Sequence, residues 1–274
     1  MGNGAQVTLF IILGLVILLL FGLILYWVSA VVPKQAQIQT STIQNEQAAI
    51  SGLLEGFLED AGRRGVYRAG SHGGYIAPEG DEEYTESNPI PDYDLYFYAG
   101  SSFPFVLNNE KVSLLSKQQI EERISDYVAI EFNKAVNSSN AFKNLQKPSM
   151  PIVKTMINLN DVVIMATYPV KAKKAGAEII ASDVSVSIPV RFGLVYSIAA
   201  ELVNSIKNNQ YYDISKDCSK YGDGKINIYL LPGKDVELHA VRVVDAQPLY
   251  QKFYAPFEFR IGIKNKKVQG ECVG

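Results

Sequence analysis

The residues best suited to hold an ion are acidic side chains clustered in one stretch of the chain. The candidate ligands are Glu79, Asp81, Glu82, Glu83 and Glu86. No lysine or arginine stands between Arg68 and Lys111. Calcium takes about six to eight oxygen ligands, which clustered carboxylates could supply in part. The spacing matches no known calcium loop, so the stretch is either a calcium site or a solvated acidic loop.

Tyrosines gather in the same stretch, at Tyr84, Tyr93, Tyr96 and Tyr98. Tyrosine gives a large contact area at a low entropy cost and is enriched at recognition surfaces. We therefore predict a binding surface here. The alternative is that about half of these rings belong to the core, as aromatic side chains commonly do.

Few groups in the chain suit catalysis. The two histidines, His72 and His239, and the two cysteines lack the spacing of a zinc site. There is no nucleophile elbow, phosphate loop or dinucleotide fingerprint. The glycine-rich segment 70–74 could cradle an anion with backbone N–H groups, or mark a tight turn beside a strand. The sequence predicts no catalytic or cofactor-binding residue, and hence a non-enzymatic protein.

Two features favour a location outside the cytoplasm. In an oxidising compartment Cys218 and Cys272 could close a loop of about fifty residues and add roughly 3–4 kcal/mol of stability. Two unrelated thiols are the alternative. Asn137 opens an Asn-Ser-Ser triplet, a potential glycosylation acceptor.

An apolar run from Leu9 to Val32 contains no charged side chain. A bilayer core about 30 Å thick needs roughly 20 such residues in a helix. Tyr26 and Trp27 suit the headgroup layer at its end. The run exceeds the roughly 7–15 apolar residues of a cleaved secretory signal, and no basic residue precedes it. We predict a single-pass signal-anchor, with the N-terminus in the cytoplasm and the domain outside.

Charge excludes one class of partner. The chain has 26 lysines and arginines against 28 aspartates and glutamates, and no basic stripe is evident. A nucleic-acid partner is therefore not expected.

Apolar residues at helical spacing predict three helices beyond the anchor. Residues 33–65 form a stalk and amphipathic helix that Gly65 would cap. Ser116 and Gln119 suit a capping box for a helix to about Val136. A third helix opens at Pro189 and ends near Asn208. Its predicted core face is Leu194, Val195, Ile198, Ala199, Leu202, Val203 and Ile206.

Strand-like runs occupy residues 94–98, 152–159, 162–170, 178–188, 225–231, 236–244 and 253–263. The short polar connections between several of them favour antiparallel hairpins. The predicted fold class is α+β, with helices packed on these hairpins. The predicted divisions are a tail (1–8), the transmembrane helix (9–32), the stalk (33–65) and an extracytoplasmic domain (66–274) with a candidate boundary near 148.

Several short motifs recur together: Gln6–Gly14, Gly65–Tyr67, Gly73–Ile76, Ile120–Val128, Asn160–Val163, Tyr168–Val170 and Pro189–Phe192. Together they resemble a family of uncharacterised single-pass membrane proteins of small-genome archaea, over most of the chain up to about residue 210. Family members carry a cysteine in each of the first two soluble helices. This chain has Ser51 and Ala135 in those regions, so that disulfide is not transferred. The resemblance implies an archaeal envelope protein and supplies no catalytic residues.

The N-terminus is also similar, more faintly, to archaeal type IV pilins. Those begin with a short leader that ends in glycine, followed by a Gln-x-Ser-x-Glu pattern. Gln6 and Thr8 fit this pattern, whereas Phe10 replaces the glutamate that pairs with a neighbouring subunit. The similarity implies a filament subunit cleaved after Gly4.

Together these patterns predict a cell-envelope protein with a non-catalytic extracytoplasmic domain for binding or surface organisation. The alternatives are a pilin-like filament subunit and a membrane-anchored, metal-assisted ecto-hydrolase. The expected partners are the lipid bilayer and either another envelope protein or a second copy of the chain.

Overall fold

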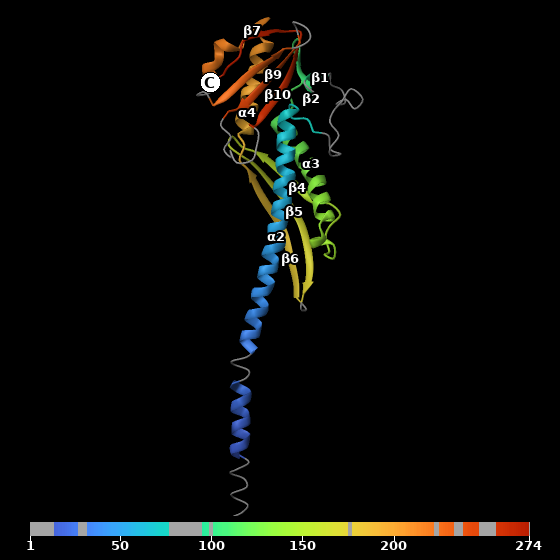
Figure 1. Ribbon diagram of the computed structural model, residues 1–274, viewed down its shortest axis with the longest axis vertical. Coiled ribbons are helices and arrows are strands. Elements are labelled where there is room, and N and C mark those ends of the chain that lie inside the picture. The colour runs from blue at the N-terminus through green and yellow to red at the C-terminus, as the bar shows by residue number, and fades with distance from the viewer. Residues whose placement is uncertain are drawn as a thin grey trace, which may run out of the picture. The chain divides into compact units, whose positions relative to one another are not determined.

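The computed structural model describes residues 14–26, 32–76, 95–98, 101–174, 177–221, 225–232, 238–246 and 256–273 (Figure 1). Contacts divide the chain into two units. The smaller unit is residues 1–50 with 173–179, and the larger is residues 51–172 with 180–274. The fold mixes helices with several sheets, which confirms the predicted α+β class at this level.

The predicted span falls in the smaller unit and is described in part. Residues 14–26 are helical, and their side chains are exposed. Leu9 and Trp27 lie outside the described residues, while Val32 opens the next helix. No helix in the described part of the chain is long and apolar enough to cross a membrane.

Helix α2 covers Val32–Ser71, 40 residues, and continues beyond the predicted end at Gly65. Gly65 does not cap the helix, because it lies where α2 meets a neighbouring helix. A Cβ atom there would stand 3.0 Å from a ring carbon of Tyr127. Within the larger unit the buried side of α2 consists of Leu54, Leu58, Ala61, Val66 and Ala69.

The largest sheet has the strand order β1-β2-β10-β9-β8, with β3 paired to β2. Its strands are β1 (Leu95–Tyr98), β2 (Ser101–Asn108), β3 (Lys111–Val112), β8 (Ile226–Pro232), β9 (Leu238–Asp245) and β10 (Glu258–Lys264). The predicted hairpins account for the antiparallel pairs of β8, β9 and β10. However, β2 is an unpredicted strand, and it pairs with β10 in parallel.

A second sheet has the order β4-β5-β6, with strands β4 (Ile152–Ile157), β5 (Val162–Lys174) and β6 (Ala177–Ile188). Strands β4 and β5 are antiparallel, as the short Asn160-Asp161 connection predicts. A small parallel pair, β7 (Tyr211–Asp213) and β11 (Lys267–Gln269), was not predicted.

Two further helices complete the larger unit. Helix α3 (Lys117–Ser138) begins with the predicted capping box of Ser116 and Gln119. Helix α4 (Phe192–Lys207) begins three residues after Pro189, because Val190 still donates its N–H to Ile188 in a turn. The 3-10 helices are η1 (Asn140–Phe142) and η2 (Ile214–Lys220).

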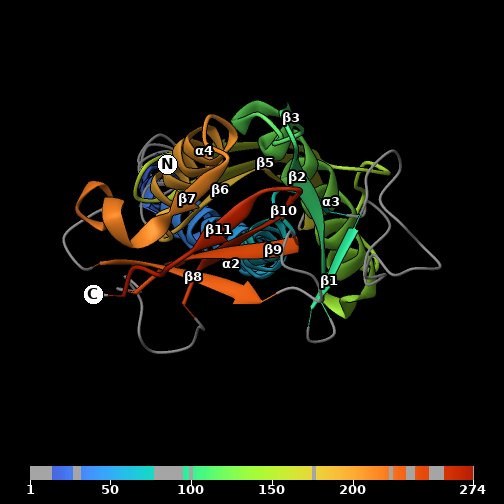
Figure 2. The same ribbon diagram turned by 90° about the horizontal axis from the view of Figure 1, so that it is seen from above.

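The core face of α4 is as predicted except at Leu194, which is half-buried, and Phe192 adds to it. The Phe192 ring lies 4.8 Å from that of Phe257 and 5.9 Å from that of Phe259, centroid to centroid. The ring of Tyr67 on α2 also lies 5.7 Å from Phe257. Both helices therefore pack against the region where β10 begins, which Figure 2 shows from above.

Candidate functional site

Most of the predicted ion ligands and binding tyrosines fall outside the described residues. These are Glu79, Asp81, Glu82, Glu83, Glu86, Tyr84 and Tyr93. Tyr96 and Tyr98 lie on β1, of which the backbone alone is described. In the described ranges no group of three or more histidine, cysteine or acidic residues is placed to hold a metal ion. The calcium site and the tyrosine surface stay predictions.

Asn137 lies in the last turn of α3 and is exposed. Its side-chain amide donates a hydrogen bond to Asn133 Oδ1 at 3.2 Å. The amide is accessible on the surface, and its glycosylation stays a prediction.

Cys218 and Cys272 form a disulfide, with their Cα atoms 5.4 Å apart. Cys218 lies in η2, and Cys272 is bridged by backbone hydrogen bonds to Ile228 of β8. The bond therefore ties the 3-10 helix and the C-terminal segment to the edge strand of the large sheet. The two cysteines lie 54 residues apart in sequence, so the folding of distant segments brings them together.

Beside the disulfide two buried tyrosines share a polar network. The hydroxyl groups of Tyr212 and Tyr221 lie 2.8 Å apart, and Tyr212 donates to Asp217 Oδ2 at 2.7 Å. Burial raises the pKa of both phenols. Hydrogen bonds from Lys220 and Tyr212 lower the pKa of Asp217. At neutral pH the network consists of two neutral phenols and one carboxylate.

The glycine segment after α2 forms a turn. Gly73 and Gly74 have φ values of +63° and +93°, a region that side chains with a Cβ rarely adopt. Gly74 donates its N–H to Ala69 O at 2.6 Å, which closes the end of the helix. Tyr75 follows with no exposed surface. The segment therefore forms the tight turn, which is one of the two alternatives that the sequence leaves open.

A buried ion pair joins the start of α4 to the end of β9. Arg191 donates from Nε to Asp245 Oδ2 at 2.8 Å and from a terminal nitrogen to Oδ1. The two side chains are 12% and 3% exposed. Because a buried carboxylate is costly without a partner, this paired geometry holds the residue before α4 against the end of β9.

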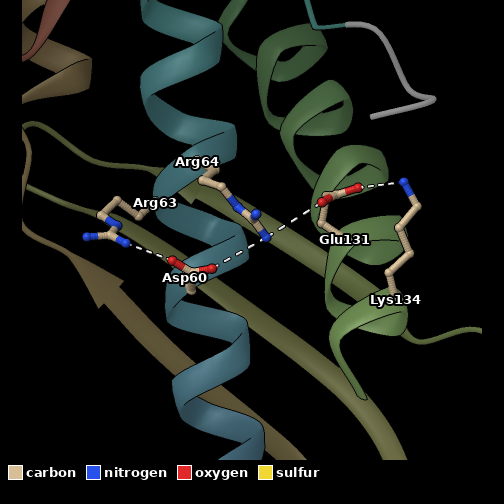
Figure 3. Close-up of polar contacts among 5 residues, drawn as sticks. All are labelled: Asp60, Arg63, Arg64, Glu131 and Lys134. Atoms are coloured by element: carbon tan, nitrogen blue, oxygen red, sulfur yellow. Dashed lines mark hydrogen bonds and ion pairs between the residues drawn. The ribbon is translucent and has the colours of Figure 1, made fainter. Parts of the chain in front are cut away.

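Charged side chains also link α2 to α3 (Figure 3). Arg64 lies between Asp60 of its own helix, at 3.4 Å, and Glu131 of α3, at 3.6 Å. Arg63 contacts Asp60 at 2.7 Å, and Lys134 contacts Glu131 at 2.8 Å. The Glu131 side chain is 9% exposed, so the charges of Arg64 and Lys134 are needed to stabilise its carboxylate. This network stabilises the packing of α2 against α3.

The surface that could bind a partner is the outer side of β4 and β5. We call it the β4–β5 face and define it as Ile152, Lys154, Met156, Val163, Met165 and Thr167. These residues oppose one another across the two strands in three pairs. The opposite side of the same strands is buried and includes Ile164 and Tyr168. Apolar residues thus occupy both sides of the hairpin.

A pocket of about 540 Å³ lies at the turn between β4 and β5. Its lining is Lys117, Ile157, Asn158, Leu159, Asn160, Asp161 and Gly193. Gly193 donates its N–H to Asn158 O at 3.1 Å, and Lys117 Nζ donates to Ile157 O at 3.1 Å. These contacts join the turn to the first turns of α3 and α4. The pocket therefore lies between this turn and the first turns of the two helices.

The sequence prediction did not single out the β4–β5 face. A signal was present, because residues 152–157 read Ile-Val-Lys-Thr-Met-Ile, which puts apolar side chains on both sides of a strand. A strand with one solvated side normally alternates apolar with polar residues.

The chain matches no known family model, and neither the curated proteins nor the solved structures contain a match to it. The resemblance to the archaeal membrane-protein family therefore stays a prediction.

Proposed function

We propose that the chain is a membrane-anchored protein of the cell envelope with a non-catalytic domain outside the cytoplasm. The domain binds another macromolecule through the β4–β5 face. The observation that carries the binding role is the exposure of this face. Ile152 is 67% exposed, Met156 44% and Met165 37%.

Exposed apolar side chains that adjoin one another mark interaction surfaces in soluble domains. Methionine is suited to such surfaces, because its flexible, polarisable side chain adapts to a partner. Besides Met1 the chain has three methionines, at positions 150, 156 and 165. All three are at least 37% exposed, on or directly before the β4–β5 hairpin.

The anchor is argued from the apolar run Leu9–Val32 and from the element that follows it. Helix α2 begins at Val32, and from Leu54 onward its buried side chains belong to the core of the domain. A chain that leaves the bilayer at Val32 thus enters the domain through one helix. The resemblance to archaeal single-pass proteins supports the same proposal.

The location outside the cytoplasm is supported by the Cys218–Cys272 disulfide. Structural disulfides persist in oxidising compartments and are rare in the cytosol, where thiols are kept reduced. The exposed acceptor Asn137 is compatible with that location.

Membrane fractionation tests the anchor. The full-length protein should stay in the membrane pellet through a wash in alkaline carbonate, which removes peripheral proteins. A variant with Leu18→Arg and Leu19→Arg should move to the supernatant, because each charge at the centre of a span costs about 2.5–3.5 kcal/mol. The matched control places two arginines in the domain, at the exposed positions Ser215 and Ser219. Release of the unmodified protein by carbonate would overturn the proposal.

A pilin-like filament subunit is the second candidate, and the length of α2 favours it. In such a subunit an apolar segment and the helix that enters the domain would form the packing element of a filament. This candidate requires cleavage after Gly4. An intact mass that includes Met1–Gly4 in membrane-extracted protein counts against it.

A further inference from the structure

We propose that the β4–β5 face is the contact surface of a homodimer. Two copies pack these sheets face to face about a two-fold axis that runs along β5. The inference rests on the proposed binding function and names its partner, a second copy of this chain.

The exposed residues of the β4–β5 face are mostly apolar, which supports a dimer contact. An antiparallel sheet with one solvated side normally presents polar side chains to water. On the β4–β5 face, apolar side chains take four of the six positions in the three cross-strand pairs. Ile152 lies opposite Thr167, and Met156 lies opposite Val163. Such a surface gains free energy when a second apolar surface covers it.

The third strand adds an acidic flank to the same side. On β6 the exposed Asp183 alternates with the buried Val184 and Ile188. A Cβ atom on Gly62 of α2 would approach the Cδ1 atoms of both Ile164 and Ile188. These two isoleucines therefore face α2 together. Asp183 consequently points to the outer side, which it shares with the β4–β5 face.

Opposite charges on the two outer strands of the sheet also support the dimer. Lys154 lies on β4 directly opposite Met165, and Asp183 lies on β6, on the other flank of the central strand. Lys154 has no ion-pair partner in the described part of the chain, and Asp183 accepts a hydrogen bond from Ser182 alone there. A two-fold axis along β5 lays β4 of each copy over β6 of the other. Each Lys154 then faces the strand that carries the partner copy's Asp183, and the apolar residues meet at the centre.

The edge of β4 offers no alternative route to pairing at the end near α3. Ile157 donates its N–H to Glu121 Oε1 at 2.8 Å and accepts a hydrogen bond from Lys117 Nζ at 3.1 Å. Helix α3 thus covers this edge, which protects it from strand addition. The β4–β5 face beside this edge is exposed.

The orientation of the axis suits two chains in one membrane. Within the larger unit α2 packs obliquely across β5 and β6, where Gly62 lies close to Ile164 and Ile188 (Figure 1). An axis parallel to the strands keeps both α2 helices pointing the same way, so both chains enter the dimer from the same side at Ser51. An axis across the strands would bring them in from opposite sides. Sheets packed face to face also keep their strands within about 30° of each other.

Charge exchange in the full-length protein, purified in detergent, tests this arrangement. The dissociation constant of the dimer is measured by sedimentation velocity over a dilution series. Lys154→Glu places two carboxylates opposite each other and should raise the dissociation constant at least about tenfold. Adding Asp183→Lys to that variant recreates both pairs with reversed charges and should restore the dissociation constant to within about threefold. Lys143→Glu, at an exposed position after η1, makes the same change in net charge and should have no effect.

A cross-link provides the second readout. Met165→Cys lies on the central strand near the axis and should form a disulfide between copies on mild oxidation. The proposal is overturned if the unmodified protein is monomeric at tens of micromolar. It is also overturned if Lys154→Glu and Lys143→Glu behave alike, or if the exchanged pair binds no better than Lys154→Glu. None of these results bears on the carbonate wash, so a failed dimer and a failed anchor are distinguishable.

Discussion

Asp245 is 2% exposed, and the Arg191 guanidinium balances the charge of its carboxylate. The hydrogen bonds that Arg191 donates to Asp245 in turn raise the pKa of Arg191. Arg191 belongs to one of the short motifs that carry the family resemblance. Its role could not be predicted from sequence, because the partner lies 54 residues further along the chain.

Asp245→Asn should lower the free energy of unfolding by about 3 kcal/mol, because it leaves the Arg191 charge buried without a counter-charge. Urea unfolding of the full-length protein, followed by circular dichroism, measures the change. Asp126→Asn on the exposed face of α3 is the matched control and should stay within about 0.5 kcal/mol of the unmodified protein. Equal stabilities for the two variants would contradict the assigned role of the pair.

The Tyr212 phenol contributes to the response of stability to alkali. Burial, aided by hydrogen bonds with Tyr221 and Asp217, raises its pKa in the folded protein. Since the folded pKa exceeds the unfolded value of about 10, the stabilising contribution is complete below that pH and is lost as the pH rises further. Tyr212→Phe should therefore reduce the fall in unfolding free energy between about pH 9 and 11. Tyr211→Phe, at the exposed neighbouring position, should retain the original pH dependence.

At the level of elements, local signals predicted much of the larger unit. The capping box of α3, the buried side of α4 and the β4–β5 hairpin follow from side-chain period and turn residues. The parallel pairing of β2 with β10 does not, because it joins segments separated by more than 150 residues. The end of α2 was also missed, since Gly65 reads as a helix cap unless the neighbouring helix is known.

Two glycines of α2 differ in their surroundings, because Gly70 is closely packed and Gly52 lies at the surface. A Cβ atom on Gly70 would collide with the carbonyl oxygen of Glu258, whereas one on Gly52 would meet nothing within 4 Å. Gly70→Ala should therefore lower the melting temperature. Gly52→Ala should raise the unfolding free energy by up to about 1 kcal/mol through helix propensity. Thermal unfolding of both variants checks the packing of α2 on β10, and a stabilised Gly70→Ala would contradict it.

The disulfide connects η2 to the edge of the large sheet. Replacing both Cys218 and Cys272 with serine should cost about 2–5 kcal/mol, because a cross-link over 54 residues restricts the unfolded chain. Urea unfolding with and without reductant measures it. The serine variant should match the reduced protein, and an unchanged midpoint on reduction would contradict a stabilising disulfide.

At the scale of the whole molecule, the proposed function requires an anchor and an exposed apolar face on the domain. The uncharged run Leu9–Val32 predicts the anchor and the lack of a catalytic motif predicts a non-catalytic domain, and both stay predictions. The exposure of the β4–β5 face does not follow from the sequence, because whether the second side of a strand is covered depends on the packing of α2 and α3.

Thiol labelling in intact cells tests whether the domain lies outside the cytoplasm. A membrane-impermeant maleimide is applied to three proteins: the unmodified chain, an Asp126→Cys variant and an Asn3→Cys variant. Asp126 is exposed on α3, and Asn3 lies in the N-terminal tail. With the domain outside, Asp126→Cys should be labelled in intact cells and Asn3→Cys only after lysis. The unmodified chain should react only after reduction, because its two cysteines form a disulfide. Labelling of Asn3→Cys but not Asp126→Cys in intact cells would contradict this location.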